Sequence, residues 1–238
     1  MSIIWSSMQE AGRLLANGDP VVWQIITLSL RVSSVATAIG MLIGLPLGYV
    51  LGTTVFAGRR VIALLVILLV NTGMGLPPVV VGLFVTLALS RSGPLGFMGW
   101  LFTPQAMVLA QVIIATPLIA GVSAAAVGAV PEELRLQARS LGAGRLAEGL
   151  LTLNEARGGV LSAIVAGFGG VISEIGAVMM VGGNIEGYTR VMTTAIVTET
   201  RMGNTGNAIA LAFILLGLAL AVNGLLTWLQ HMGAAYER

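Results

Sequence analysis

The chain has 238 residues, of which 56% are hydrophobic and only 9% are charged, whereas soluble domains carry about 25% charged residues. So few charges exclude a water-soluble protein of this size, because most of the chain must face lipid or other apolar helices. The twelve basic residues are all arginines scattered singly along the chain, which argues against nucleic-acid binding. The absence of cysteine excludes disulfides, and a single histidine excludes a histidine-cluster metal site. We therefore expect an all-α polytopic membrane protein without a metal site.

The N-terminal residues 1–20 are predicted to form a helix that lies in the membrane interface. Apolar residues such as Ile4, Met8 and Leu15 fall on one helical face, and Gln9 and Glu10 fall on the other. A crossing helix then needs about 20 apolar residues. Five segments meet that need: Val22–Thr54, Val61–Leu89, Gln105–Gly128, Gly158–Val181 and Asn207–Gln230. The expected organisation is a single transmembrane domain, with three spans in residues 22–128, an insert at 129–157 and two spans in 158–238.

Prolines interrupt two of these segments. Pro77 and Pro78 lie in the middle of the second span, and Pro46 lies among glycines in the first. Proline removes a backbone donor and is expected to kink or break the helix. Irregular backbone at membrane depth is tolerated only where protein buries it or where it lines a cavity. The two interpretations are a pore-lining role and close helix packing at kinks.

The insert between the third and fourth spans has a different composition, with four glutamates and four arginines between residues 131 and 157. Pro131 followed by Glu132 and Glu133 is typical of a helix start. Leu134, Ala138 and Leu141 would share one face of this helix, and Gly142 would end it. A second short helix is predicted from Arg145 to Asn154. Two short helices on a bundle without a soluble domain favour a docking element for a separate protein, the alternative being a solvated loop.

This insert resembles the coupling loop of type I permease subunits of ATP-binding-cassette (ABC) importers. Aligned on Gly142, the family pattern is matched at Ala138 and Gly142, whereas Thr152 and Asn154–Glu155 depart from its Ile and Leu-Pro positions. Further stretches resemble the tungstate permeases of this superfamily, and the resemblance as a whole extends from about Thr27 to Asn223; molybdate and sulfate permeases share the Gly-Asn-Ile part. The stretches that carry it are Asn71–Pro94, Glu155–Gly158, Ile172–Asn184 and Thr189–Ile196.

The resemblance implies a homodimeric pathway for tungstate or a related oxyanion such as molybdate. It also implies two ATPase subunits at the inner face and an external oxyanion-binding protein. The chain itself would hold no cofactor and would not be an enzyme, since it lacks lysine and therefore a P-loop; ATP and Mg would bind the partner ATPase. At the coupling site we expect close backbone approach at Ala138 and Gly142 and polar contacts from Glu133 and Arg139. The full set of coupling residues is Glu133, Ala138, Arg139, Gly142 and Ala143.

The pathway is expected to be lined by hydroxyls and amides, because a fixed cationic trap would hold a dianion too tightly to release it. The candidates for this pathway or its gate are Asn71, Thr72, Thr116, Ser123, Ser173, Asn184, Thr193 and Thr194. Glu174 is a carboxylate inside a span, where an unpaired charge is costly. We expect a structural ion pair between Glu174 and Arg31, or a hydrogen-bonded network that fixes the gate. A proton relay is the competing hypothesis.

Residues 182–206 are predicted to form an outer gate loop. Its glycines predict a flexible turn, and the short amphiphilic run from Thr189 to Thr200 predicts a half-helix. Arg190, Glu199 and Arg201 would lie at its surface, suited to gating or to contact with the binding protein. An ordinary extracellular loop is the alternative.

Arginine placement predicts the orientation, because cytoplasmic loops retain positive charge. If the N-terminus is outside and the C-terminus inside, seven arginines lie on the inner side, four lie on the outer side, and Arg31 lies within a span. This distribution favours that orientation. The expected location is the prokaryotic cytoplasmic membrane, crossed several times.

The main rival function is a secondary transporter or channel without an ATPase, although an odd number of spans disfavours inverted repeats within one chain. An intramembrane enzyme is disfavoured, because the sequence lacks a nucleophile paired with a histidine base.

Overall fold

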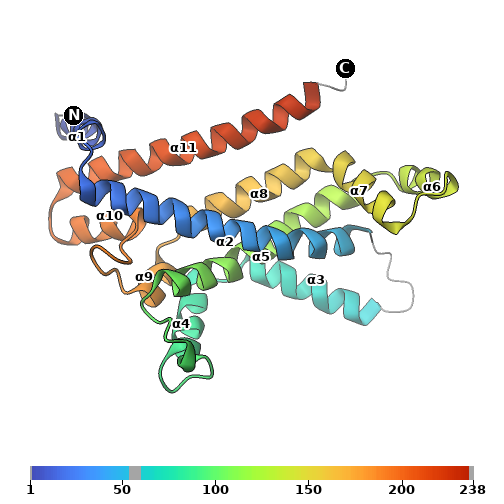
Figure 1. The fold of residues 1–238 in the computed structure, drawn as a ribbon, viewed down its shortest axis with the longest axis horizontal. Helices are drawn as coiled ribbons and strands as arrows, with labels where there is room; N and C mark the ends of the chain where they lie inside the picture. The colour runs from blue at the N-terminus through green and yellow to red at the C-terminus, as the bar shows by residue number, and fades with distance from the viewer. Residues whose placement is uncertain (1, 54–59, 236–238) are drawn as a thin grey trace.

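The computed structural model describes residues 2–53 and 60–235, and these residues form helices joined by loops (Figure 1). Thr54 lies outside the described residues, and so do residues 56–59 of the predicted connection Phe56–Arg60. One end of the elongated bundle carries α1, α10 and the beginning of α2, and the other carries α6 and α7. The helices are α1 (Ser2–Ala16), α2 (Pro20–Thr53), α3 (Arg60–Met74), α4 (Pro78–Leu89), the short 3₁₀ helix η1 (Gly96–Met98), α5 (Pro104–Gly128), α6 (Glu132–Ser140), α7 (Arg145–Glu155), α8 (Arg157–Ile172), α9 (Gly176–Gly182), α10 (Met192–Arg201) and α11 (Thr205–Ala235).

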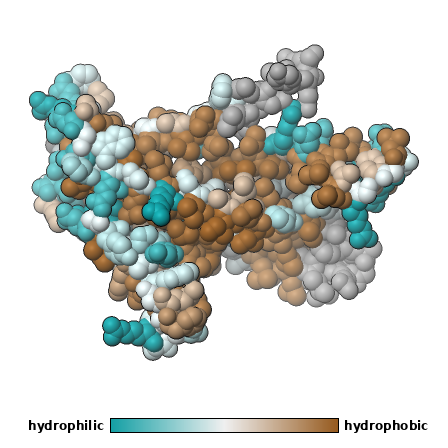
Figure 2. All heavy atoms as spheres, viewed as in Figure 1, coloured by the Kyte–Doolittle hydropathy of each residue, from teal (hydrophilic) through white to brown (hydrophobic). Residues whose placement is uncertain are grey.

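Three helices are each long and apolar enough to cross a membrane: α2, α5 and the Thr205–Trp228 part of α11. Two further pairs, α3 with α4 and α7 with α8, meet this criterion only when each bent pair is taken as one span, which gives up to five. The fold class is therefore confirmed as an all-helical membrane bundle. Figure 2 shows a broad hydrophobic surface between more polar regions at the two ends.

The second predicted span is not a kinked helix but two helices that meet at 102°. Pro77 supplies no N–H, and Pro78 occupies the first turn of α4, where a missing donor does no harm. The fourth predicted span is also divided, because α8 ends at Ile172 and α9 begins only at Gly176. Treating Gly158–Val181 as a single helix was therefore wrong. Pro46, in contrast, does not break α2, which stays helical to Thr53.

The most extensive helix contact joins α2 to α5 along a ridge of glycines spaced four residues apart: Gly40, Gly44, Gly48 and Gly52. A Cβ atom added at Gly44 would lie 2.9 Å from the carbonyl oxygen of Thr116, and one at Gly52 would lie 2.7 Å from that of Ala124. Such spacing lets two backbones approach closely inside a membrane, where hydrophobic burial cannot drive association. This ridge fixes α2 against the centre of the bundle.

The predicted interfacial helix is present as α1, which packs on α11. Ala11 joins a cluster with residues of α2, α10 and α11, and Ser7 is buried beside it. Trp5, Ile4 and Met8 remain exposed. Only part of the apolar face of α1 therefore packs against the rest of the chain, and its exposed part can contact an apolar environment such as lipid.

Candidate functional site

The two helix breaks lie next to each other in the middle of the bundle, because α4 packs against α9 (Figure 1). The fit is tight: a Cβ atom added at Gly176 would lie 2.6 Å from Val79 Cγ2, and one at Gly82 would lie 2.8 Å from Ala177 Cα. Broken helices at membrane depth are a recurrent way of forming transport sites, because their free backbone groups can face a polar ligand. We therefore take the paired breaks as the centre of the candidate site.

Three of the predicted pathway residues are exposed at the breaks. Asn71 and Thr72 lie in the last turn of α3, and Ser173 follows the end of α8. The Ser173 hydroxyl donates to the carbonyl of Gly169 at 2.8 Å, and its oxygen keeps capacity to accept. These three side chains lie at an open position beside the breaks, and their role in the pathway stays a prediction.

Four other predicted pathway residues have structural roles instead. Ser123, Thr193 and Thr194 are buried, and the hydroxyl of half-buried Thr116 donates to the Val112 carbonyl at 2.7 Å. Ser123 donates to Ile119 at 2.6 Å in the α2–α5 contact, and Thr193 donates to the Glu174 carbonyl at 2.9 Å. The Thr194 hydroxyl bonds the backbone of Val191 at the start of α10. Their hydroxyls are engaged by backbone groups of this chain, as is common for Ser and Thr in helices.

Glu174 forms no ion pair with Arg31 in the described part of the chain, so that predicted pair is wrong. The Glu174 side chain lies at the α8–α9 break, where its Oε1 accepts the N–H of Ala177 at 2.8 Å. Together with the Thr193 bond to its carbonyl, this forms the hydrogen-bonded network that was the alternative. Arg31 lies exposed on α2 and lines different cavities.

Glu174 also faces a small polar cavity of about 10 Å³, which is just enough for one water molecule. Ser33, Gln111 and Thr193 line the same cavity. The Gln111 amide donates to the Val171 carbonyl at 2.9 Å, but its Oε1 has no partner among the residues that the structure describes. A bound water would satisfy this oxygen. No group of three potential metal ligands of the His, Cys, Asp and Glu types occurs among the described residues.

The insert folds into the two predicted short helices, α6 and α7, joined by a tight turn at Gly142 with φ of +85°. Arg139 pairs with Glu148 through two hydrogen bonds, from Nε to Oε2 at 2.8 Å and from Nη2 to Oε1 at 2.7 Å. The bond from Arg139 lowers the pKa of Glu148, and the same bond raises the pKa of Arg139. Sequence reasoning missed Glu148. The signal was available in the sequence: Arg139 lies in the last turn of the first predicted helix, and Glu148, nine residues later, lies in the first turn of the second.

The surface of the insert differs from the predicted one. Ala138 is buried within the chain, so its close contact is with its own neighbours, and Ala143 is half-buried. Glu133 is exposed, and open space surrounds Gly142. Leu141 was expected to share one helical face with Leu134 and Ala138, but α6 ends at Ser140, and Leu141 beyond it is 88% exposed. The exposed surface carries five leucines that sequence reasoning did not single out together: Leu136, Leu141, Leu146, Leu150 and Leu151.

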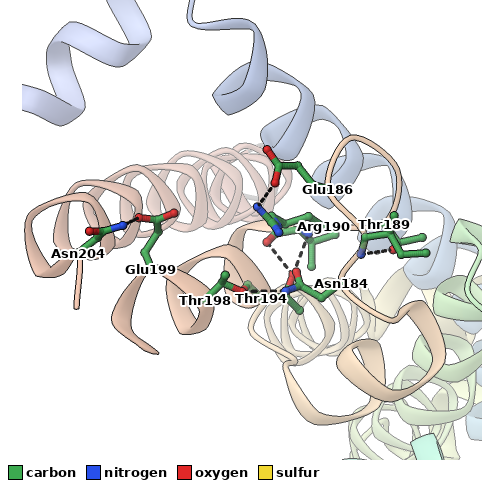
Figure 3. Close-up of polar contacts among 10 residues, drawn as sticks. Asn184, Glu186, Thr189, Arg190, Thr194, Thr198, Glu199 and Asn204 are labelled. Carbon is green, nitrogen blue, oxygen red and sulfur yellow. Dashed lines mark hydrogen bonds and ion pairs between the residues drawn. The ribbon is translucent and has the colours of Figure 1, made fainter. Parts of the chain in front are cut away.

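At the opposite end of the bundle, the loop before α10 is held by side-chain hydrogen bonds (Figure 3). Asn184 adopts a left-handed conformation and donates to Thr198 Oγ1 at 2.7 Å. The buried Thr189 hydroxyl accepts the N–H of Ile185 and donates to the Gly182 carbonyl at 2.6 Å. The glycines therefore belong to a well-bonded loop rather than the flexible turn that was predicted, whereas the predicted half-helix is present as α10.

The charges of this loop are only partly at the surface. Arg190 pairs with Glu186 at 3.1 Å, and its side chain is 17% exposed, so placing it at the surface was wrong. Glu199 is half-buried and accepts from Asn204 at 3.0 Å, whereas Arg201 is exposed. Met192 at the start of α10 donates its N–H to the Ser29 hydroxyl of α2 at 2.9 Å. This bond ties the half-helix to the bundle.

The family model for the binding-protein-dependent transport system inner membrane component matches residues 44–231. The chain belongs to this family. It is a membrane-spanning permease subunit of an ABC importer, and it is a multi-pass protein of the inner membrane.

Similar proteins support this placement. A probable anion ABC transporter permease protein of Haloferax volcanii is 46% identical over 84% of this chain and 87% of its own. The tungstate uptake system permease protein TupB of Peptoclostridium acidaminophilum is 40% identical over 97% of this chain and 100% of its own. An inward-facing structure of the MetNI methionine ABC transporter superposes with a TM-score of 0.71 at 19% identity, covering 92% of this chain and 99% of that one. The last likeness concerns the fold alone.

Proposed function

We propose that two copies of this permease form one pathway for tungstate or a related oxyanion such as molybdate. ATPase subunits that carry ATP and Mg would dock on the α6–α7 insert, and an external binding protein would deliver the anion at the α10 end. The observation that carries the proposal is the insert itself, a compact helical pair that presents exposed leucines beyond the bundle. Its location also supports an inside position for α6 and α7 and an outside position for the N-terminus.

The geometry of the insert suits the transmission of force. The Arg139–Glu148 pair joins α6 to α7, and Arg135 donates to the carbonyl of Thr53 at the end of α2 at 3.3 Å. A push on the leucine surface would therefore reach both α8, which follows α7 directly, and α2. Rigid-body movement of packed elements is the usual way in which nucleotide-driven closure reaches a membrane domain.

The choice of an oxyanion rests on the relatives named above together with the polar groups at the helix breaks. Asn71 and Thr72 can donate to an anion without trapping it as a buried cation would. The Ser173 hydroxyl would do so only after releasing the Gly169 carbonyl. Glu174, which would repel an anion, is engaged at the α9 backbone and buried. These features fit passage of a hydrated or partly hydrated dianion.

The docking role is tested by purifying the tagged chain from its native membranes in mild detergent. We expect an ATP-binding-cassette subunit to copurify with the wild type. The double variant Leu141→Ser, Leu146→Ser should copurify with roughly tenfold less ATPase subunit, because two large exposed side chains are removed from the docking surface. Leu220→Ser, the same change at an exposed leucine of α11, is the matched control and should retain the ATPase.

Equal recovery of the ATPase with the double variant would contradict docking on this surface. A wild-type chain that carries out uptake with no ATPase bound would instead favour the secondary transporter.

A further inference from the structure

The first half of α2 has a polar face that the site described above does not use. Its exposed residues Gln24, Thr27, Arg31 and Ser34 are spaced by three, four and three positions, which puts them on one side of a helix. Arg31 lies about 16 Å along the helix from Pro20, at a rise of 1.5 Å per residue. Polar surface in Figure 2 continues from the α1–α10 end toward the first turns of α2.

Arg31 is the single charged residue of α2 and has no partner within the described chain. Its guanidinium makes no ion pair or hydrogen bond there, and the carboxylate expected to neutralise it, Glu174, is bonded to Ala177. A charged side chain in contact with hydrocarbon is costly, and such residues face the bundle interior or water. The polar face of α2 is therefore suited to water or to a polar ligand rather than to lipid tails.

Arg31 lines two cavities. One, of about 480 Å³, lies between α2 and α5, and the other, of about 420 Å³, lies nearer the start of α2. Both volumes are in the range of roughly 300–1,000 Å³ that is usual for ligand sites. Tyr188, from the loop before α10, and Leu28 also line both, and Gln105 of α5 lines the larger. Beyond these polar groups the larger cavity is walled by aliphatic side chains such as Val35 and Val108.

We propose that Arg31, together with Tyr188 and Gln105, is a contact point for the translocated oxyanion on the α10 side of the helix breaks. This inference rests on the proposed function, and it names a specificity residue within that pathway. A guanidinium presents planar donors that match the oxygens of a tetrahedral oxyanion, and the amide and phenol can donate beside it. Because Arg31 is exposed, water can replace these contacts, so the anion can move on.

The first experiment measures tungstate uptake by the complete transporter in proteoliposomes, with its ATPase subunits and binding protein. Arg31→Gln should reduce uptake roughly tenfold, the effect expected for losing a charge-assisted hydrogen bond. Uptake by Arg31→Lys should lie between that of Arg31→Gln and that of the wild type, because an ammonium keeps the charge but lacks the planar pair of donors of a guanidinium. Arg91→Gln is the matched control, since it removes an exposed arginine that lines neither cavity. This control should leave uptake unchanged.

A second experiment uses the absence of cysteine from the chain. Arg31→Cys should react with water-soluble thiosulfonate reagents, and tungstate should slow the reaction. A cationic aminoethyl adduct should restore uptake at least in part, whereas a neutral hydroxyethyl adduct should not. Failure of both reagents to react would mean that lipid or the second copy covers this face, and restoration by the neutral adduct would mean that bulk alone matters. Either result would overturn the proposal.

A phosphate of a lipid headgroup has the same chemistry as the free oxyanion, and the tungstate dependence separates the two. If Arg31 contacts tungstate, tungstate-loaded binding protein should slow thiol labelling of Arg31→Cys more than empty binding protein does. Equal labelling rates would assign Arg31 to a lipid and overturn the proposal. Normal uptake by Arg31→Gln would overturn it while leaving the proposed function intact. If the wild-type complex imports neither tungstate nor molybdate, the proposed function fails, and this inference fails with it.

Discussion

Glu174 occupies the point at which α8 ends and the backbone turns into α9. Its side chain is 9% exposed and satisfies the N–H of Ala177, one of the donors that a helix start leaves without an internal partner. The neighbouring Thr193 hydroxyl bonds its carbonyl, which links the break to α10. A carboxylate placed in this way holds the backbone of the α8–α9 break in position.

Replacing Glu174 separates this structural role from a proton relay. Glu174→Gln keeps an oxygen that can accept from Ala177 and should leave the unfolding midpoint and ATP-driven uptake close to those of the wild type. Glu174→Ala removes the acceptor and should cost about 1 kcal/mol, or roughly 2–4 °C in the thermal midpoint of the purified protein. Loss of a pH-dependent transport rate in the Gln variant, with stability retained, would contradict this role and support a relay.

Individual residues show which site features a sequence can reveal. Asn71 and Thr72 were identifiable because they are polar residues beside a break that prolines indicate, whereas Ser173 was chosen as a hydroxyl within a span that was expected to be continuous. The partner of Glu174 was not identifiable, because it is a backbone group three residues away and competes with a more obvious opposite charge at Arg31. The buried hydroxyls of Thr193 and Thr194 were misassigned, since composition does not distinguish a pathway hydroxyl from one that bonds nearby backbone.

The insert is an element whose stiffness depends on one ion pair. Arg139 on α6 and Glu148 on α7 meet in a two-bond arrangement, and the glutamate side chain is 8% exposed. Bidentate pairs fix geometry as well as charge. The open turn at Gly142 leaves this pair as the main polar link between the two helices.

The lowered pKa of Glu148 gives this link a defined pH dependence. A carboxylate whose pKa is lower in the folded state contributes stability that is complete above its unfolded pKa, about 4.3, and is lost as the pH falls through the folded value. Protection of the α6–α7 amides against hydrogen exchange, corrected for intrinsic rates, should therefore be constant from about pH 8 to 5 and decline below about pH 4.

Two variants of the insert complete this measurement. Glu148→Gln should exchange faster at neutral pH and should lose the acid transition. Glu133→Gln, which changes an exposed carboxylate of the same insert, should behave as the wild type. An unchanged acid transition in Glu148→Gln would show that another group governs the insert.

Elements differed in how well the sequence predicted them. The long apolar stretches of α2, α5 and α11 were predicted within a few residues, because length and hydropathy decide them. Prolines indicated the α3–α4 break but not its angle of 102°. The α8–α9 break was missed, because it depends on the Glu174 bond and on packing of Gly176 against Val79, neither of which leaves a pattern in the sequence.

At the scale of the whole molecule, the bundle separates two polar ends by a hydrophobic surface (Figure 2). One end holds the bonded loop before α10 and the polar face of α2, and the other holds the exposed leucines of the insert. Between them lie the paired helix breaks. This order would suit the proposed importer, in which the anion enters at the α10 end and energy is supplied at the insert.

In the proposed mechanism, ATP hydrolysis by docked subunits drives oxyanion import through this permease. The most direct test reconstitutes the complete transporter in proteoliposomes and measures ATP hydrolysis and anion uptake with the binding protein empty or loaded with tungstate, molybdate or sulfate. We predict that tungstate- or molybdate-loaded binding protein stimulates hydrolysis and that uptake stops without ATP. Oxyanion uptake that continues without ATP and collapses when the proton or sodium gradient is removed would contradict the account.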